Sequence, residues 1–155
     1  MRLNGLMHYL ALGAAMFLLI YHQATTWIPL FPWNDVARFS RKEIVSESAF
    51  NGLLMGTGAI CLMAGNSGFS HWYPLIYYPF LFVGECVDWW IPYFSEGFAK
   101  ARKVWDYDSK YGRTLKFIPH KAGKRTPDAN HTLLHLATVF TIVAVFLDRY
   151  SLPNH

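Results

Sequence analysis

The stretch that decides the fold is WYPLIYYPFLFVGECVDWWIPY, which covers Trp72–Tyr93. It is mostly apolar, and its length is close to the roughly 20 residues that an α-helix needs to span a bilayer. Its two carboxyl groups, those of Glu85 and Asp88, come near its end. An ionisable group inside a membrane segment is energetically expensive, so it indicates a functional site. The stretch therefore predicts a membrane helix that carries a polar site close to one membrane surface.

Three further apolar runs of similar length cover about residues 3–21, 48–65 and 131–147. A cleaved signal peptide is an alternative for the first run, but the run is long for one and the sequence around Ala24 is a poor cleavage site. Four such runs predict an all-α protein. We expect an integral membrane four-helix antiparallel bundle, folded as a single membrane domain over residues 1–155.

Charge is scarce and unevenly placed. Only 15% of the 155 residues are charged, whereas a soluble domain carries about 25%. The net charge is +4, and most of the 14 Lys and Arg residues lie in two loops, at about 22–46 and 94–126. These loops share one side of a four-span protein, and the positive-inside rule makes that side cytoplasmic. We expect a multi-pass protein of the bacterial inner membrane with both termini extracytoplasmic. Its basic residues would meet anionic lipid headgroups rather than nucleic acid.

The long loop 94–126 has patterns of its own. Apolar residues recur at helical spacing among its basic residues, at Phe94, Phe98, Ala101 and Trp105. This spacing predicts an amphipathic segment on the cytoplasmic surface, with a solvated basic loop as the alternative. The triplet Thr126-Pro127-Asp128 predicts the start of the last helix, with Thr126 as its cap and Pro127 in the first position.

Six side chains that can ionise or bind a metal fall at one level of this bundle, near its cytoplasmic side. They are His22, Glu47, Glu85, Asp88, His131 and His135. Glu85 and Asp88 are three residues apart, and the two histidines of the last run are four apart, so each pair shares one face of its helix. The antiparallel order brings these two pairs to a similar depth. We expect Glu85 and His135 at the centre of a site, Asp88 and His131 beside them, and His22 and Glu47 at its edge.

Four roles fit such a cluster. A divalent transition metal suits His131, His135 and Glu85, although neither the zincin spacing nor a Glu-x-x-His pair is present. Proton exchange is the second role, because such groups form relays in transporters. Binding of a small amphipathic molecule, such as a lipid or a quinone, is the third. In the fourth, the carboxylates and imidazoles only satisfy one another as buried polar groups.

The first three roles predict a binding or catalytic site that faces the cytoplasm. The fourth predicts a non-catalytic accessory or structural subunit of a membrane assembly, whose outer faces are covered by partners or by further copies of the chain. The sequence leaves open which role applies, which ligand or metal is involved and whether the protein is an enzyme.

Several stretches together resemble a family of small, uncharacterised four-span bacterial membrane proteins. They are Trp27–Leu30, Asn34–Val36, Gly84-Glu85, Trp89–Tyr93, Tyr111–Thr114, Phe117–Pro119 and Asn130-His131 through His135. The resemblance covers about residues 25–147 and implies topology but no activity, and Asp88 is not a fixed residue of that family. The matching stretches include loop ends and helix ends on one side. We therefore expect loop 94–126 to fold over Glu85, His131 and His135 as a lid.

Overall fold

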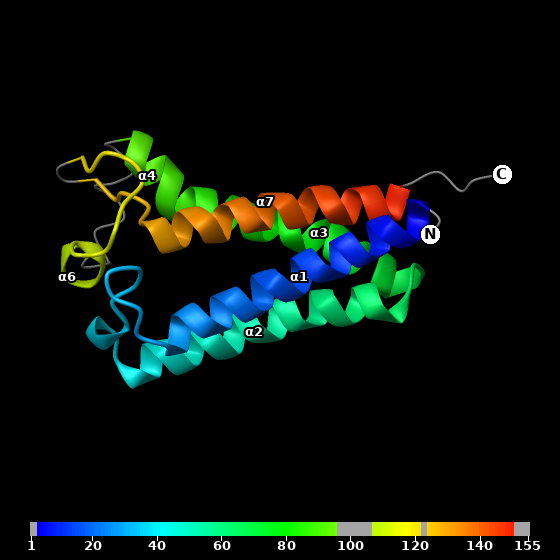
Figure 1. Ribbon diagram of the computed structural model, residues 1–155, viewed down its shortest axis with the longest axis horizontal. Helices are drawn as coiled ribbons and strands as arrows, with labels where there is room; N and C mark the ends of the chain where they lie inside the picture. The colour runs from blue at the N-terminus through cyan, green and yellow to red at the C-terminus, as the bar shows by residue number, and fades with distance from the viewer. Residues whose placement is uncertain (1–2, 96–106, 122–123, 151–155) are drawn as a thin grey trace.

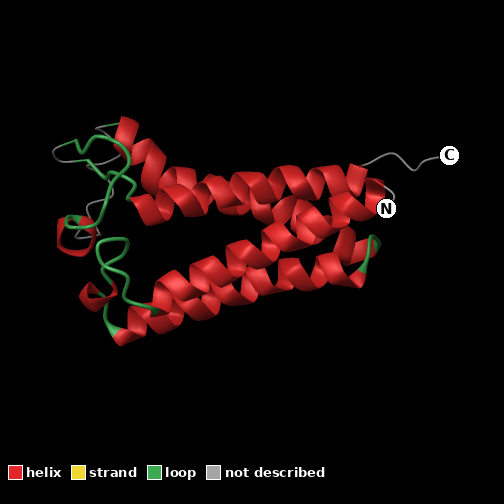
Figure 2. Ribbon diagram, in the orientation of Figure 1, coloured by secondary structure: helices red, strands yellow, loops and turns green. Residues whose placement is uncertain are grey.

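Four long helices make up most of the protein in the computed structural model, which describes residues 3–95, 107–121 and 124–150. They are α1 (Leu3–Trp27), α2 (Arg41–Ala64), α3 (Gly68–Glu85) and α7 (Ala129–Tyr150). Consecutive long helices run in opposite directions, so the two chain ends lie together at one end of the molecule (Figure 1). The described residues form helices and loops without any strand (Figure 2). The expected all-α class is confirmed.

Short elements fill the connections. They are η1 (Val36–Arg38), η2 (Cys86–Trp90), α4 (Ile91–Phe94) and α6 (Tyr107–Tyr111). η2 is a π-helical turn that continues α3 into α4. Insertions of this kind in an α-helix are frequent at functional sites. The expected amphipathic segment beyond Phe94 falls mostly on residues 96–106, which lie outside the described residues.

Two helices extend well beyond their apolar runs. α1 continues past Tyr21 to Trp27, and α2 begins at Arg41, seven residues before the run at Ser48. The early start of α2 has a local cause, because Ser40 and Glu43 form a reciprocal capping box. Much of the expected loop 22–46 is therefore helical. His22 lies on the extended part of α1, and Glu47 lies in the early turns of α2.

The start of α7 corrects one sequence prediction. Asp128, not Thr126, is the cap, because its Oδ1 accepts the backbone N–H of His131 at 2.8 Å and its carbonyl accepts that of Thr132 at 2.8 Å. Pro127 therefore precedes the helix. Thr126 instead binds the loop, since its backbone carbonyl accepts a hydrogen bond from the Tyr107 hydroxyl at 2.6 Å.

The core lies between the long helices, where α1 and α3 each pack against both α2 and α7. Small residues of α1 let the helices approach, with Ala11 and Ala15 fully buried. Gly58 of α2 has a specific reason to be small, because a Cβ atom there would lie 2.6 Å from the Tyr78 hydroxyl of α3. This end of the molecule is closely packed.

Two of the described helices are long and apolar enough to cross a membrane, namely α1 over Gly5–Trp27 and α7 over its whole length. α2 and α3 do not reach the same apolarity. α2 carries charges in its first turns, and α3 contains the prolines Pro74 and Pro79 among several tyrosines. By length and composition, the described residues thus contain two candidate membrane-spanning helices.

Candidate functional site

The six residues of the expected cluster line one cavity of about 300 Å³, here called the inner cavity. Its walls come from all four long helices and from η2. His22 stands on α1, Glu47 on α2, Glu85 on α3, Asp88 on η2, and His131 and His135 on α7. The structure thus places all six residues around a common space, and a similar depth for them was predicted from the sequence.

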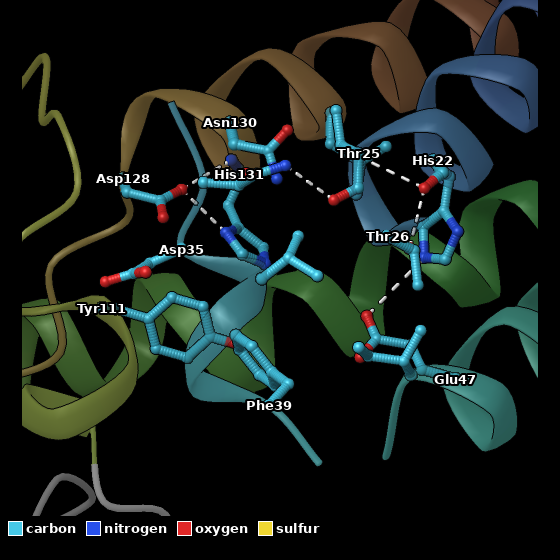
Figure 3. A pocket seen from close by; sticks show the side chains of 14 residues that line it. His22, Thr25, Thr26, Asp35, Phe39, Glu47, Tyr111, Asp128, Asn130 and His131 are labelled. Atoms are coloured by element: carbon cyan, nitrogen blue, oxygen red, sulfur yellow. Dashed lines mark hydrogen bonds and ion pairs between the residues drawn. The ribbon is translucent and has the colours of Figure 1, made fainter. Parts of the chain in front are cut away.

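Two further cavities adjoin the inner one on the loop side. An outer cavity of about 530 Å³ shares Glu47, Asp88, Trp89 and His131 with it and adds Arg125. A small cavity of about 50 Å³ lies between His22 and Glu47 on one side and Asp128 and His131 on the other (Figure 3). His131 and Glu47 each line all three spaces. These two side chains thus border all three cavities.

The cluster residues mostly bond to groups outside the cluster. Within the cluster, Glu47 Oε1 lies 3.8 Å from His22 Nε2, and the ring centroids of His131 and His135 lie 6.1 Å apart. Glu85 accepts the Thr138 hydroxyl at 2.7 Å through Oε1. His135 Nδ1 accepts the indole N–H of Trp90 at 3.0 Å. The expected pairing of Glu85 with His131 or His135 is not found among these contacts.

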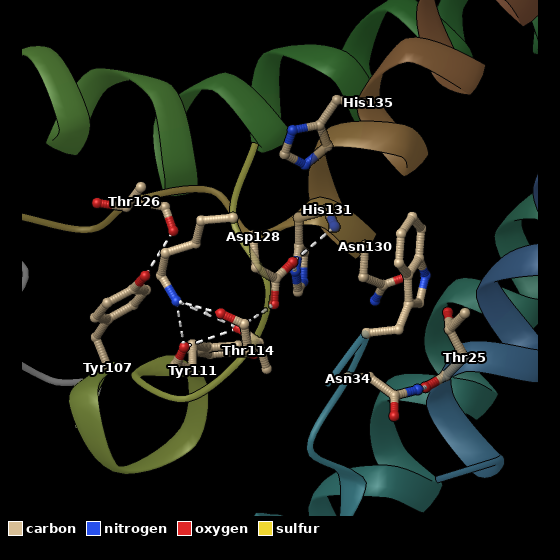
Figure 4. Close-up of polar contacts among 12 residues, drawn as sticks. Thr25, Asn34, Tyr107, Tyr111, Thr114, Thr126, Asp128, Asn130, His131 and His135 are labelled. Atoms are coloured by element: carbon tan, nitrogen blue, oxygen red, sulfur yellow. Dashed lines mark hydrogen bonds and ion pairs between the residues drawn. The ribbon is translucent and has the colours of Figure 1, made fainter. Parts of the chain in front are cut away.

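Asp128 orients His131. Its Oδ1 lies 2.7 Å from His131 Nδ1, and its Oδ2 accepts the Thr114 hydroxyl at 3.0 Å (Figure 4). The other ring nitrogen of His131 is thereby turned away from Asp128 (Figure 3). Burial alone would raise the pKa of Asp128, but the charge of His131 and hydrogen bonds from His131 and Thr114 lower it below its ordinary value. Sequence reasoning treated Asp128 only as part of a helix start, although its spacing from His131 was a readable signal.

Aromatic rings hold the two histidines of α7. The His131 ring lies 3.9 Å from that of Trp89 and 5.3 Å from that of Tyr111, measured between ring centroids. Trp90 contacts His135 at 6.1 Å. From the sequence, Trp89 and Trp90 were assigned no contact with the cluster, so their part in the site was missed. The π-helical turn explains the difference, because it changes the direction of both indoles relative to a regular helix.

Three buried atoms in the lining of the inner cavity lack a hydrogen-bond partner, namely Glu85 Oε2, His22 Nδ1 and the hydroxyl oxygen of Tyr77. Glu85 is 8% exposed and its Oε2 makes no hydrogen bond, while His22 is 5% exposed and its Nδ1 makes none. Leaving a buried polar atom unpaired costs free energy, so such atoms call for an explanation. All three atoms belong to side chains that line the same space.

The two loops close the site on one side. Leu115 N–H donates to the Pro32 carbonyl at 2.8 Å, and Ala129 N–H donates to the Leu115 carbonyl at 2.7 Å. Arg113 binds Asp35 at 2.7 Å across the same junction. Burial raises the pKa of Tyr107 to about 12, so this phenol stays protonated and donates to Thr126 (Figure 4). The described part of the expected lid does lie against His131, through Tyr111.

The described residues do not form a metal centre. Within residues 3–95, 107–121 and 124–150, no three His, Cys, Asp or Glu side chains are grouped so that they could hold a metal ion. His131, His135 and Glu85 are instead bonded to Asp128, Trp90 and Thr138 respectively. The metal role suggested by the sequence thus has no structural support.

Comparison of the chain with models of known protein families, with curated proteins and with solved structures finds no match in any of the three. The resemblance drawn from the sequence stays a prediction, and the function is argued from the site itself.

Proposed function

We propose that this protein is a four-span membrane protein that binds a small amphipathic molecule in its inner cavity. The observation that carries the proposal is the group of unpartnered polar atoms, Glu85 Oε2, His22 Nδ1 and the Tyr77 hydroxyl, on a cavity of about 300 Å³. A ligand with a polar head would satisfy them. An apolar tail would suit the Leu54, Phe80 and Leu81 side of the cavity.

The outer faces of α2 and α3 support four spans rather than two. Large apolar side chains are exposed along both helices at helical spacing, namely Phe50, Leu53, Ile60 and Met63 on α2, and Phe69, Trp72, Ile76, Phe80 and Val83 on α3. A soluble monomer rarely exposes continuous apolar surface of this extent. α1 and α7 expose similar faces, with Phe17 and Phe140 as examples. A bilayer around all four helices would cover these faces at once.

The charge distribution supports the orientation. Lys and Arg concentrate in the connections at the end where the inner cavity lies, and Arg2 and Arg149 are the exceptions. By the positive-inside rule this end faces the cytoplasm of a bacterial cell, and both termini are extracytoplasmic. The cavity would then lie below the cytoplasmic headgroups.

A matched pair of glycine variants tests ligand binding. Gly84 lines the inner cavity, Gly56 lines none of the three cavities, and a Cβ atom at either meets nothing within 4 Å. Gly84→Leu should therefore reduce the cavity without disturbing the fold, and Gly56→Leu should do neither. Native mass spectrometry of protein released from lipid nanodiscs would measure bound amphiphile.

We expect wild type and Gly56→Leu to retain an amphiphile that Gly84→Leu releases. Equal occupancy in all three proteins, or none in any of them, would contradict the proposal. The second result would favour a structural subunit.

A further inference from the structure

The inner cavity carries acidic groups and lacks basic ones. Its lining includes the carboxyl groups of Glu47, Glu85 and Asp88, and no Lys or Arg among the residues that the structure describes. The three histidines of the cavity are not fixed positive charges. Arg125 lines only the outer cavity, and its Nη1 donates to the backbone carbonyl of Asp88 at 3.1 Å. The lining therefore offers a ligand head acidic side chains and no Lys or Arg among the described residues.

Among the carboxyl groups of the cavity, Glu85 has a buried oxygen without a hydrogen-bond partner. Thr138 occupies its Oε1, whereas Oε2 is buried and has no partner. In its ionised form Glu85 only accepts hydrogen bonds, so the group missing from the ionised form is a donor. A charged donor would be favoured over a neutral one, because an ionised pair forms the stronger hydrogen bond and offsets the buried charge.

Aromatic rings complete this environment. Phe50, Tyr77, Phe80 and Trp89 line the same cavity as Glu85. The faces of such rings attract cations through their quadrupoles, and the attraction is stronger away from water. Carboxylates and aromatic faces together are the surroundings that an organic ammonium group prefers.

The path to the cavity also fits a lipid-like molecule. Phe50 of α2 and Phe80 of α3 line the cavity and are 66% and 74% exposed on the outer face of the helices. The cavity thus reaches the apolar surface between α2 and α3. A molecule could enter from the bilayer there, without crossing the basic loops that would repel a cation.

We propose that the inner cavity binds an amphiphile with an ammonium head, with its N–H groups on Glu85 and its chain leaving between Phe50 and Phe80. This inference rests on the proposed function and specifies its ligand class. Glu85 is a binding residue here, and no chemical step is assigned to it.

The test compares three probes of equal chain length in phosphatidylcholine nanodiscs, namely dodecylamine, dodecanol and dodecanoate. Affinity is read from the saturable rise in melting temperature and from native mass spectrometry. The amine should bind wild type about tenfold or more tightly than the alcohol, with the carboxylate weakest. Glu85→Gln keeps an acceptor for Thr138 but removes the charge, and it should remove the preference for the amine. Asp108→Asn, which removes an exposed charge outside the three cavities, should leave the preference intact.

Each result decides the inference. Equal binding of amine and alcohol, both lost in Gly84→Leu, would overturn the ammonium assignment while leaving amphiphile binding in place. Binding of no probe would contradict both proposals. If Glu85→Gln failed to fold, the ranking of the three heads on wild type would still decide between an ammonium and a neutral ligand.

Discussion

The two ends of the same four helices are built differently. Toward the end that holds the termini, Ala15, Leu62, Tyr78 and Val145 are 0% exposed. At the loop end, the pair α1–α2 diverges from α3–α7 (Figure 1), and the inner cavity lies there. Small residues let the first end close, while histidines, carboxyls and indoles occupy the second. The contrast fits the proposal that one end stabilises the fold and the other binds a ligand.

The charged side chains at the two ends also differ in their partners. At the closed end Asp148 lies 3.5 Å from Arg149 and 3.4 Å from His8, and Arg149 also donates to the Ser70 carbonyl at 3.2 Å. The charged groups there neutralise one another. At the open end Glu85 Oε2 has no such partner. Variants at the closed end should therefore change stability, and variants at the open end should change binding.

The largest expected effect on stability is at the buried ion pair of the closed end. Arg149→Met would leave Asp148 without its main countercharge, and we expect a loss of about 3–5 kcal/mol in the free energy of unfolding. Arg113→Met is the control, because the Arg113 side chain is 57% exposed beside Asp35 and should cost about 1 kcal/mol or less. Denaturation in mixed micelles measures both. Equal losses of unfolding free energy in the two variants would show that the buried ion pair contributes no more to stability than the exposed one.

The next effect is steric and compares two glycines of α2. Gly58→Leu would push a side chain into Tyr78, where a Cβ atom alone comes within 2.6 Å of the hydroxyl, and should cost about 1–3 kcal/mol. Gly56→Leu meets open space and should leave stability unchanged or slightly raised. The melting temperatures of the two variants would measure this difference in stability. A tolerated Gly58→Leu would mean that α2 and α3 are not held closely there.

Asp128 should have a smaller effect that depends on pH. Asp128→Ala removes the cap of α7 and the acceptor for Thr114, at a cost of about 1–2 kcal/mol. Because the pKa of Asp128 is lowered by folding, its charge stabilises the protein above the unfolded pKa, and this contribution is lost as the pH falls through the folded pKa. The stability gap between wild type and Asp128→Asn should therefore be full near pH 7 and narrow below about pH 4. A gap that widened on acidification would refute this sign.

The smallest effect on stability is expected at the cavity itself. Gly84→Leu fills space rather than displacing packed atoms, so its melting temperature in ligand-free detergent should stay within a few degrees of wild type, equivalent to about 0.5 kcal/mol. Thr141→Val, one turn beyond Thr138 and outside the three cavities, gives a matched reference on α7. A large loss for Gly84→Leu alone would show that the open end is packed after all.

Helix positions and the six cavity residues could be predicted from the sequence because apolar run length and alternating direction fix depth. Contacts could not, because they depend on helix rotation and on η2, whose π-helical turn reorients Trp89 and Trp90. Thr138, the partner of Glu85, was missed for this reason, because a hydroxyl carries no sequence signal that it faces a carboxyl group on another helix. Asp128 differs, since its spacing of three residues from His131 was a readable signal.

The central claim is that α2 and α3 cross the membrane, so that the inner cavity opens into lipid. Single cysteines at Leu53 and Ile76, both on exposed apolar faces, test it in a chain with Cys61 and Cys86, the free cysteines of the described residues, changed to alanine. Lys42→Cys, at the exposed start of α2, serves as the accessible reference. With a membrane-impermeant maleimide on vesicles of both orientations, we predict labelling of Lys42→Cys from the cytoplasmic face alone. Leu53→Cys and Ile76→Cys should react only after detergent is added, and their labelling in intact vesicles would contradict the claim.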